Sequence, residues 1–324
     1  MGLRAKLSAI GGTVVVIGGA NTDIVGLSDA ALIQSDSNPG HVRVSAGGVG
    51  RNIAENLARL GVSTQLVTVF GGDAEARALR ESCEEATIGL AGALTADELP
   101  GARYLAIADE AGDMALALND MRALELLTPA YLASGAPAAV LASADLVVVD
   151  ANIAPDALAY VAAAVEAPIL ADSVSVAKAP RLIPLLPRLA ALKTNLLEAE
   201  RLLGDEAPVS QDGSDPTPGQ RAASALARLG TDSVFLTMAE EGCAFASGDG
   251  AGTLRATGAN IVDTTGAGDS FTAGVAIGLL GGLLPLEVAA VGSAIAAHTM
   301  AVERSVNPDL DLERIITDAE ELLA

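Results

Sequence analysis

The stretch D-T-T-G-A-G-D-S-F-T-A-G, residues 263–274, sets Gly-Ala-Gly directly before an acid and at the start of a long apolar run. Two glycines and an alanine leave the main chain almost bare, so a ligand can approach it closely. If a helix begins here, the amides of Gly266, Ala267 and Gly268 and the positive end of the helix dipole attract an anion. Asp269 is then either a base for chemistry on that anion or only a favourable partner of the dipole.

An anion cradle and a base within one helical turn are the parts needed to transfer a phosphoryl group to a hydroxyl. The base accepts the hydroxyl proton while the amides stabilise charge on the transferred group. Other phosphate motifs do not occur in the sequence: no lysine follows a glycine, as a Walker A loop requires. The run G-V-G-R-N-I at 48–53 opens like a dinucleotide fingerprint, but Ile53 replaces its third glycine, which argues against a nicotinamide oxidoreductase.

Composition limits the partners of the 324-residue chain. Its net charge of −22 argues against nucleic acid, because phosphate backbones bind basic surfaces. With lysine at positions 6, 178 and 193 only, an anionic ligand has to be held mainly by backbone amides, arginines or a metal ion. Cys83 and Cys243 lack CxxC spacing, which favours two buried thiols in a reduced, cytoplasmic protein.

Apolar runs alternate with amphipathic stretches along most of the chain. The runs, bounded by Gly, Asp or Pro, are 14–17, 65–70, 146–149, 169–171, 191–193 and 233–236. The amphipathic stretches are 51–60, 155–165, 196–203 and 220–229. This alternation predicts an α/β domain with a mainly parallel sheet covered by helices on both faces.

Two regions depart from that alternation. Residues 41–46, 104–107 and 115–118 are predicted to be antiparallel strands of a small sheet that projects as a lid. The apolar region 274–302 contains Pro285 and Glu287, so we predict two packed core helices there and no membrane span.

Two signatures together resemble the ribokinase-like (PfkB) family of carbohydrate and nucleoside kinases. They are G-G-V-G-R-N-I-A-E-N-L-A-R-L-G at 47–61 and the stretch at 263–274, in that family's order and strand–helix context. The resemblance covers nearly all of residues 1–324. It implies one doubly wound α/β kinase domain, with lid strands from about 20–46 and 103–120, that uses ATP and Mg²⁺. Activation by K⁺ is a further trait of the family.

Further stretches resemble one branch of that family, which phosphorylates a nucleoside. They are 18–24, 37–40, 118–121, 150–153 and 307–310. The family's ribokinases usually carry lysine where this chain has Val49, which argues against free ribose as the acceptor.

The resemblance implies roles for individual residues at the acceptor site. Asp269 would deprotonate the 5′-hydroxyl, and the amides of residues 266–268 would form the anion hole. Asp23, at the end of the first strand, would accept hydrogen bonds from the 2′- and 3′-hydroxyls, since a carboxylate accepts on two oxygens. Alternatively, Asp23 is only an acidic turn residue that follows a strand.

Amides and glycines complete the implied acceptor site. Gly47 and Gly48 would let the sugar lie close to the backbone, and Asn52 would reach a ribose hydroxyl. Alternatively, the two glycines only form a packed turn, and Asn52 is only a polar residue in the first turn of a helix. The amides that would read the nucleobase edge, because they both donate and accept, are Asn21, Asn119 and Asn152. Each of these three could instead only form a turn.

A second set of residues is implied for the nucleotide. T-N-L-L-E at 194–198 matches the family's N-x-x-E element, so Asn195 would lie near the triphosphate and Glu198 would organise Mg²⁺ through water. The alternative is a helix cap followed by a solvated glutamate. The other implied ATP-binding residues are Thr237, Glu241 and Gly242 of the loop 237–242, together with Gly268 and Asn307.

Several alternatives remain open from the sequence. The acceptor could be ribose, adenosine or another nucleoside, and the chain could be a non-catalytic nucleoside-binding module on the same fold. Exposed edges of the lid strands would allow a homodimer.

Overall fold

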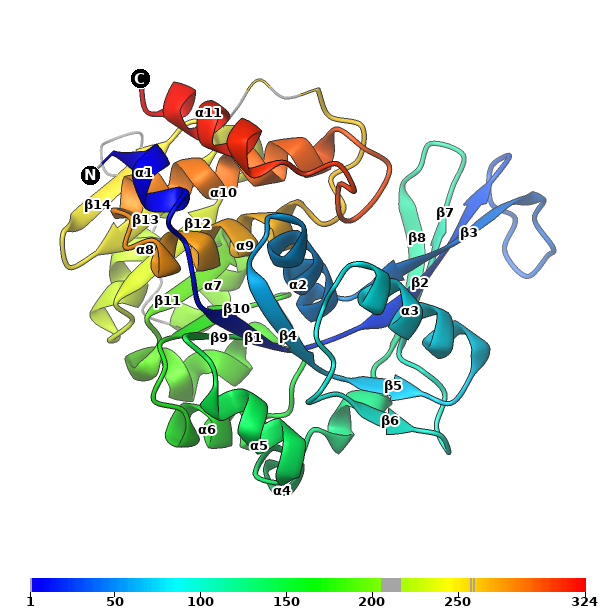
Figure 1. Ribbon diagram of the computed structural model, residues 1–324. Coiled ribbons are helices and arrows are strands. Elements are labelled where there is room, and N and C mark those ends of the chain that lie inside the picture. Colours follow the sequence, from blue (N-terminus) through cyan, green and yellow to red (C-terminus); the bar gives the residue numbers. More distant parts are fainter. Residues whose placement is uncertain (1, 205–216, 257, 259) are drawn as a thin grey trace.

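The computed structural model describes residues 2–204, 217–256, 258 and 260–324, and within them the strands form three sheets (Figure 1). The central sheet has the order β14 (Gly250–Leu254), β13 (Cys243–Ser247), β12 (Ser233–Thr237), β11 (Ala191–Asn195), β10 (Ile169–Asp172), β9 (Leu146–Asp150), β1 (Thr13–Ile17) and β4 (Ser63–Val67). The strands from β12 to β4 are parallel, and β13 and β14 are antiparallel to their neighbours.

Alternate strand residues face opposite layers of helices, as the continuous apolar runs predict. Val14 and Val16 pack in one core cluster, and Val15 and Ile17 pack in the other. Helices of the first cluster are α1 (Leu3–Leu7), α2 (Val49–Arg59), α3 (Ala74–Glu85), α9 (Ala267–Leu280), α10 (Pro285–Met300) and α11 (Leu312–Leu322). Those of the second are η1 (Arg122–Leu126), α4 (Pro129–Leu132), α5 (Gly135–Ala142), α6 (Pro155–Ala164), η2 (Ala179–Arg188), α7 (Leu196–Leu203) and α8 (Pro218–Arg228).

The small sheet stands beside this core, to the right in Figure 1. Its order is β3 (Gly40–Gly47), β2 (Asn21–Ser28), β7 (Arg103–Ala108) and β8 (Met114–Asp120). A further pair, β5 (Val69–Gly71) and β6 (Leu94–Ala96), is parallel. The predicted α/β architecture with a separate small sheet is therefore confirmed.

The apolar region 274–302 contains the second half of α9 and all of α10, two packed helices as predicted. Across the part of the chain that is described, no helix is long and apolar enough to cross a membrane. Both cysteines are buried free thiols, again as predicted.

Two details of the prediction are wrong. The run 65–70 is divided, because β4 ends at Val67 and β5 leaves the central sheet to pair with β6. Asp23 is not at the end of the first strand, since β1 ends at Ile17 and Asp23 lies within β2. The polar start of β2 looks like a turn in the sequence, but it pairs with β3 on one side and β7 on the other.

The order of the strands in the central sheet marks the place where a ligand crevice is expected. From β1 the chain first adds β4 on one side, and later adds β9, β10, β11 and β12 on the other. The order therefore reverses between β1 and β9. Open parallel sheets bind ligands beyond the carboxyl ends of the strands at such a point.

Candidate active site

The loops after β1 and β9 meet at this reversal of strand order. Buried Asp150, the last residue of β9, accepts hydrogen bonds from the amides of Gly19 (2.8 Å) and Asn152 (2.8 Å). Burial raises the pKa of Asp150. The Gly19 carbonyl accepts from the Arg51 amide at 3.0 Å, and Gly48 packs against the same carbonyl. The turn 47–48 that precedes α2 is thereby held over the end of β1.

Helix α9 begins at the predicted glycine turn, but only two of the three predicted anion-hole amides, those of Gly266 and Gly268, are without an acceptor among the described residues. Gly266 is the N-cap residue with φ of 80°, and a Cβ there would lie 1.9 Å from the Ser305 carbonyl oxygen, so the turn requires glycine. Among the described residues, no acceptor is bonded to the amides of Gly266, Gly268 or Asp269. The Ala267 amide differs, because it donates to the Thr264 carbonyl at 3.2 Å. Three amides without an acceptor therefore lie at the positive end of a 14-residue helix.

Asp269 is partly buried in the first turn of α9, and Asn52 Nδ2 donates to its Oδ2 at 2.7 Å. Burial, reinforced by the nearby carboxylates of Asp172 and Asp150, raises the pKa of Asp269 to about 7, although Asn52 and Lys193 oppose the shift. A carboxylate with a pKa near neutrality is suited to accept a proton.

A buried lysine lies directly beneath this turn, and the sequence predictions did not include it. A Cβ on Gly268 would be 2.7 Å from Lys193 Nζ, which also lies 3.4 Å from Asp172 Oδ2. The hydroxyl of Thr272 on α9 donates to the same Asp172 oxygen at 2.6 Å. Burial opposes the charge on Lys193, but Asp172, Asp269 and Glu198 outweigh it and raise the pKa of Lys193. The sequence contains one signal for the Lys193 ammonium, which is a lysine at the carboxyl end of the apolar run 191–193.

Asp23 lies on the face of the small sheet that is turned toward α2. Asn21 Nδ2 donates to Asp23 Oδ1 at 2.6 Å, and a Cβ on Gly47 would be 2.1 Å from Asp23 Oδ2, so only glycine admits the carboxylate here. Burial raises the pKa of Asp23. Asn119 belongs to the same face, because the ladder runs from Asp23 to Tyr104 and from Tyr104 to Asn119.

Asn152 has a fixed amide orientation. Lys178 Nζ donates to Asn152 Oδ1 at 2.5 Å, whereas a Cβ on Gly19 would be 3.1 Å from Asn152 Nδ2. Because ammonium groups only donate, the Asn152 amide presents its NH₂ group toward the loop after β1.

The predicted nucleotide residues gather at the ends of β11 and β12. Asn195 caps α7 in a reciprocal box with Glu198: its Oδ1 accepts from the Glu198 amide at 2.9 Å, and its backbone amide donates to Glu198 Oε2 at 3.2 Å. Asn195 Nδ2 also donates to Glu198 Oε1 at 2.8 Å. Glu198 is buried rather than solvated, and Ser173 Oγ donates to its Oε2 at 2.5 Å. Thr237 pairs with Asn195 across the ladder.

Glu241 and Gly242 follow Thr237 in the hairpin between β12 and β13, where the Met238 amide donates to the Gly242 carbonyl at 2.8 Å. Glu241 is exposed in η4 (Ala239–Glu241), followed by Gly242 with φ of 93°. Asn307 is buried and both ends of its amide are engaged, by the His298 carbonyl (2.8 Å) and the Asp309 amide (2.9 Å).

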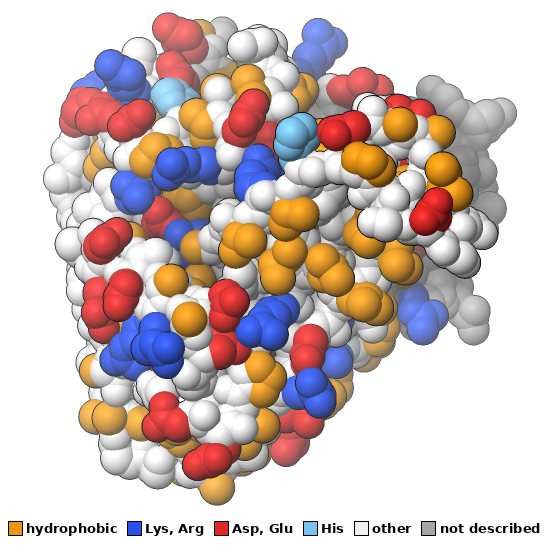
Figure 2. All heavy atoms as spheres, turned by 90° about the vertical axis from the view of Figure 1, so that its right-hand side faces the viewer, with side chains coloured by type: hydrophobic (Ala, Val, Ile, Leu, Met, Phe, Trp, Pro, Cys, Tyr) orange, Lys and Arg blue, Asp and Glu red, His pale blue; other side chains and the backbone are white. Residues whose placement is uncertain are grey.

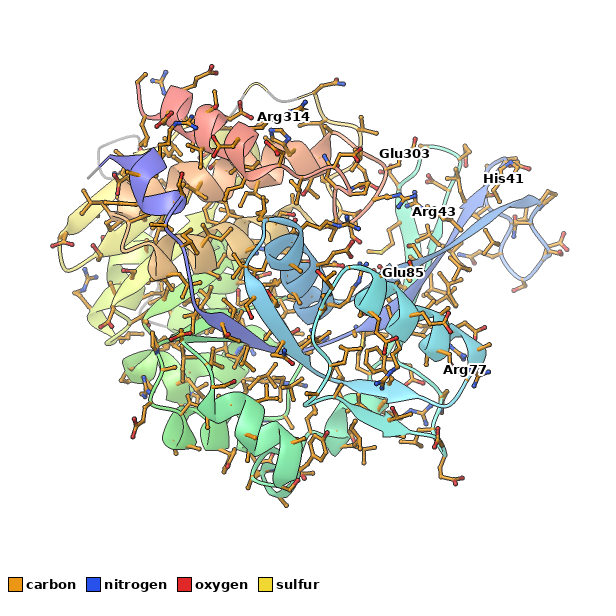
Figure 3. The ribbon with its side chains drawn as sticks, in the orientation of Figure 1. His41, Arg43, Arg77, Glu85, Glu303 and Arg314 are labelled. Atoms are coloured by element: carbon orange, nitrogen blue, oxygen red, sulfur yellow. The ribbon has the colours of Figure 1, made fainter. Side chains whose placement is uncertain are left out.

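A cavity of about 410 Å³ lies between the small sheet, α2 and the loop 303–308. Figure 3 shows Arg43 of β3 and Glu303 of that loop, which both line it. Asp23 and Arg51 also line this cavity, whereas Asp269 does not. It therefore adjoins the Asp269 centre without containing it.

Comparison with known proteins agrees with this arrangement. A family model described as pfkB family carbohydrate kinase matches residues 12–310. The chain is 31% identical over 306 residues to the pseudouridine kinase of Escherichia coli (strain K12), covering 94% of this chain and 95% of that protein. It is 34% identical over 305 residues to the uncharacterized sugar kinase YeiI of the same organism, covering 94% and 82%.

Among solved structures, Arabidopsis thaliana ribokinase complexed with ribose and ATP superimposes with a TM-score of 0.84. That likeness covers 96% of this chain and 99% of the ribokinase chain at 22% sequence identity. It shows a ribokinase-like fold.

Proposed function

The chain belongs to the pfkB family of carbohydrate kinases, and from that premise we propose that it transfers the γ-phosphoryl group of ATP to the 5′-hydroxyl of pseudouridine. The observation that carries the kinase chemistry is Asp269, a partly buried carboxylate with a pKa of about 7 beside free amides at the start of α9. The nucleoside branch that the chain resembles at 18–24, 37–40, 118–121, 150–153 and 307–310 is the pseudouridine kinases.

In the proposed reaction Asp269 takes the proton of the 5′-hydroxyl, whose oxygen forms a bond to the γ-phosphorus. The bond from that phosphorus to the ADP oxygen breaks, and ADP leaves with its electron pair. The amides of Gly266, Gly268 and Asp269 stabilise charge on the transferred group. Lys193 adds positive charge beneath them.

We assign acceptor recognition to the residues around Asp23. Its carboxylate and Asn52 would bind the ribose hydroxyls beside Gly47 and Gly48. The amides of Asn21, Asn119 and Asn152 would read the uracil edge, and the fixed NH₂ group of Asn152 suits a carbonyl of the base.

The nucleotide would bind along Asn195, Thr237, Glu241, Gly242, Gly268 and Asn307. In the described part of the chain no group of three His, Cys, Asp or Glu residues could hold a metal. Mg²⁺ would be held mainly by the nucleotide phosphates and water, and Glu198 would organise it through that water, since Mg²⁺ keeps several waters. Activation by K⁺ belongs to the same proposal and is tested by replacing K⁺ with tetramethylammonium in the assay.

An acceptor panel tests the proposal directly. We expect ADP release with pseudouridine, and a kcat/KM for uridine that is lower by more than about tenfold. Uridine is the sharpest control, because the two nucleosides differ only in the ring atom joined to ribose. Ribose and adenosine complete the panel. Equal activity with uridine would defeat the pseudouridine assignment and leave the kinase intact, whereas no phosphorylation of any acceptor, with ATP still bound, would favour a nucleoside-binding module.

The pH dependence of kcat provides a second test. Asp269 must be ionised to accept the proton, and its pKa is raised to about 7, so kcat should fall about tenfold per pH unit below neutrality and level off above it. Measurement from pH 5 to 9.5 with pseudouridine saturating locates the midpoint. A plateau extending down to pH 5 would contradict the assignment of Asp269 as the base.

We also propose that two copies associate through the small sheet, which would act as a lid. Its face opposite Asp23 exposes large apolar side chains, namely Val42, Val44, Ile107, Leu116 and Leu118. Figure 2, which views the molecule from the side that carries this sheet, shows hydrophobic side chains gathered there. Light scattering that finds a monomer at assay concentration would end this proposal. A cytoplasmic location remains a prediction that fits the two free thiols.

A further inference from the structure

The orientation of the Asn52 amide depends on a buried arginine. Asparagine can present either its oxygen or its NH₂ group to Asp269, and only NH₂ stabilises an ionised carboxylate. Arg51 Nη1 donates to Asn52 Oδ1 at 2.9 Å, and Ser305 Oγ donates to the same oxygen at 3.3 Å. A guanidinium carries donors only, so the amide oxygen must face Arg51 and Nδ2 must face Asp269.

Arg51 is itself held in place by groups on two elements. Its other terminal nitrogen pairs with the Glu55 carboxylate one turn along α2, and Nη1 also donates to the Ala46 carbonyl at 3.3 Å. Arg51 is 6% exposed and Glu55 is 5% exposed. Arg59 donates from Nε to Glu55 Oε1 at 2.7 Å, so the Glu55 carboxylate is bound by two arginines of α2, Arg51 and Arg59. Buried ion pairs contribute little net stability, so stability alone explains this one poorly.

The same guanidinium joins the small sheet to the reaction centre. Ala46 lies in β3 directly before the turn 47–48, and the single hydroxyl proton of Ser305 is shared between the Ala46 carbonyl, at 3.4 Å, and Asn52 Oδ1. On the basis of the proposed function, we propose that Arg51 is a positioning residue for phosphoryl transfer: it fixes the Asn52 amide so that it donates to Asp269, and it ties that amide to the root of the small sheet.

The orientation of the Asn52 amide affects the stability of the ionised form of Asp269. The charged groups that face it are Asp172 of β10, Asp150 of β9 and Lys193 of β11, and the neutral donor from α2 is Asn52. Without Arg51 the amide can reverse and place its oxygen against the carboxylate. A hydrogen bond to a charged group contributes about 1.5 kcal/mol or more, equivalent to about one pKa unit. The acid limb of kcat should then move upward by about one pH unit.

The test is the double variant Arg51→Met and Glu55→Gln, which removes the donor without leaving an unpaired buried carboxylate. At pH 7 we expect kcat to fall about fivefold, because the ionised fraction of Asp269 falls from about a half to about a tenth. At pH 9.5 the loss should disappear. Arg59→Met is the matched control, since Arg59 contacts the same Glu55 and the Pro308 carbonyl but neither Asn52 nor Ala46. Its kcat profile should match the wild-type profile.

An unchanged pH midpoint in the double variant would overturn the proposal, whether kcat is normal or is lowered equally at every pH. A second readout does not depend on any acceptor. In ¹³C-carboxyl NMR of aspartate-labelled protein, with Asp269→Asn identifying the resonance, the Asp269 midpoint should rise by about one unit in the double variant. If the wild-type protein phosphorylates no acceptor, the proposed function fails, while this midpoint still decides the role of Arg51.

Discussion

Replacing Asp269 with asparagine is expected to lower kcat about 10²–10⁴-fold, the weight of a general base, and to leave the KM for the acceptor nearly unchanged. The asparagine side chain keeps the shape of the site, and its Oδ1 can still accept from Asn52, whose bond to Asp269 Oδ2 is 2.7 Å long. It cannot take the hydroxyl proton. Because the lost interaction forms only in the transition state, kcat and kcat/KM should fall together in steady-state assays of ADP release.

The competing interpretation of Asp269 is that of a dipole partner without chemistry. An acid that only complements the N-terminus of a helix contributes about 0.3–1 kcal/mol of stability and nothing to kcat. Asp156→Asn is a matched control, since Asp156 lies in the first turn of α6. We expect its kcat to stay within about twofold of wild type, because a surface change of this kind rarely exceeds 0.5 kcal/mol. Near-normal turnover of Asp269→Asn would refute the assigned base.

Local patterns account for the parts of this protein that its sequence predicts well. The β1, β9 and β12 strands are short apolar runs, and the α2 and α9 helices each follow a glycine-bearing turn. Periodicity and turn chemistry act over a few residues, so both can be read without knowledge of the fold. The positions of Gly266 and Asp269 at the start of α9 follow from the same local information.

Contacts between distant segments could not be predicted in this way. Lys193 lies under Gly268 only because β11 and α9 are brought together by the order of the sheet. Asp23 lies within a strand of the small sheet and not at the end of the first strand, because its polar segment pairs with β3 and β7. The engaged amide of Asn307 likewise depends on the His298 carbonyl of α10. The resemblance to the kinase family implies roles for individual residues, but the contacts that each residue makes can be known only from the three-dimensional structure.

Replacing Lys193 with methionine should have the largest effect on stability. The buried ammonium lies 3.4 Å from Asp172 Oδ2, and its loss leaves that carboxylate buried without a cation. Removing one member of a buried pair costs about 3–5 kcal/mol of the free energy of unfolding. Urea denaturation followed by circular dichroism measures this loss.

The same substitution should lower kcat by about 10²-fold, the weight of one group that stabilises charge at an anion hole. Two effects combine: positive charge disappears from beneath Gly268, and the pKa of Asp269 rises further because Lys193 no longer opposes the shift. The double variant Lys193→Met and Asp172→Asn separates folding from chemistry, since it removes both buried charges. We expect it to recover most of the lost stability while kcat stays low. If kcat recovers together with stability, then Lys193 serves the fold alone, and the charge beneath the anion hole has no part in phosphoryl transfer.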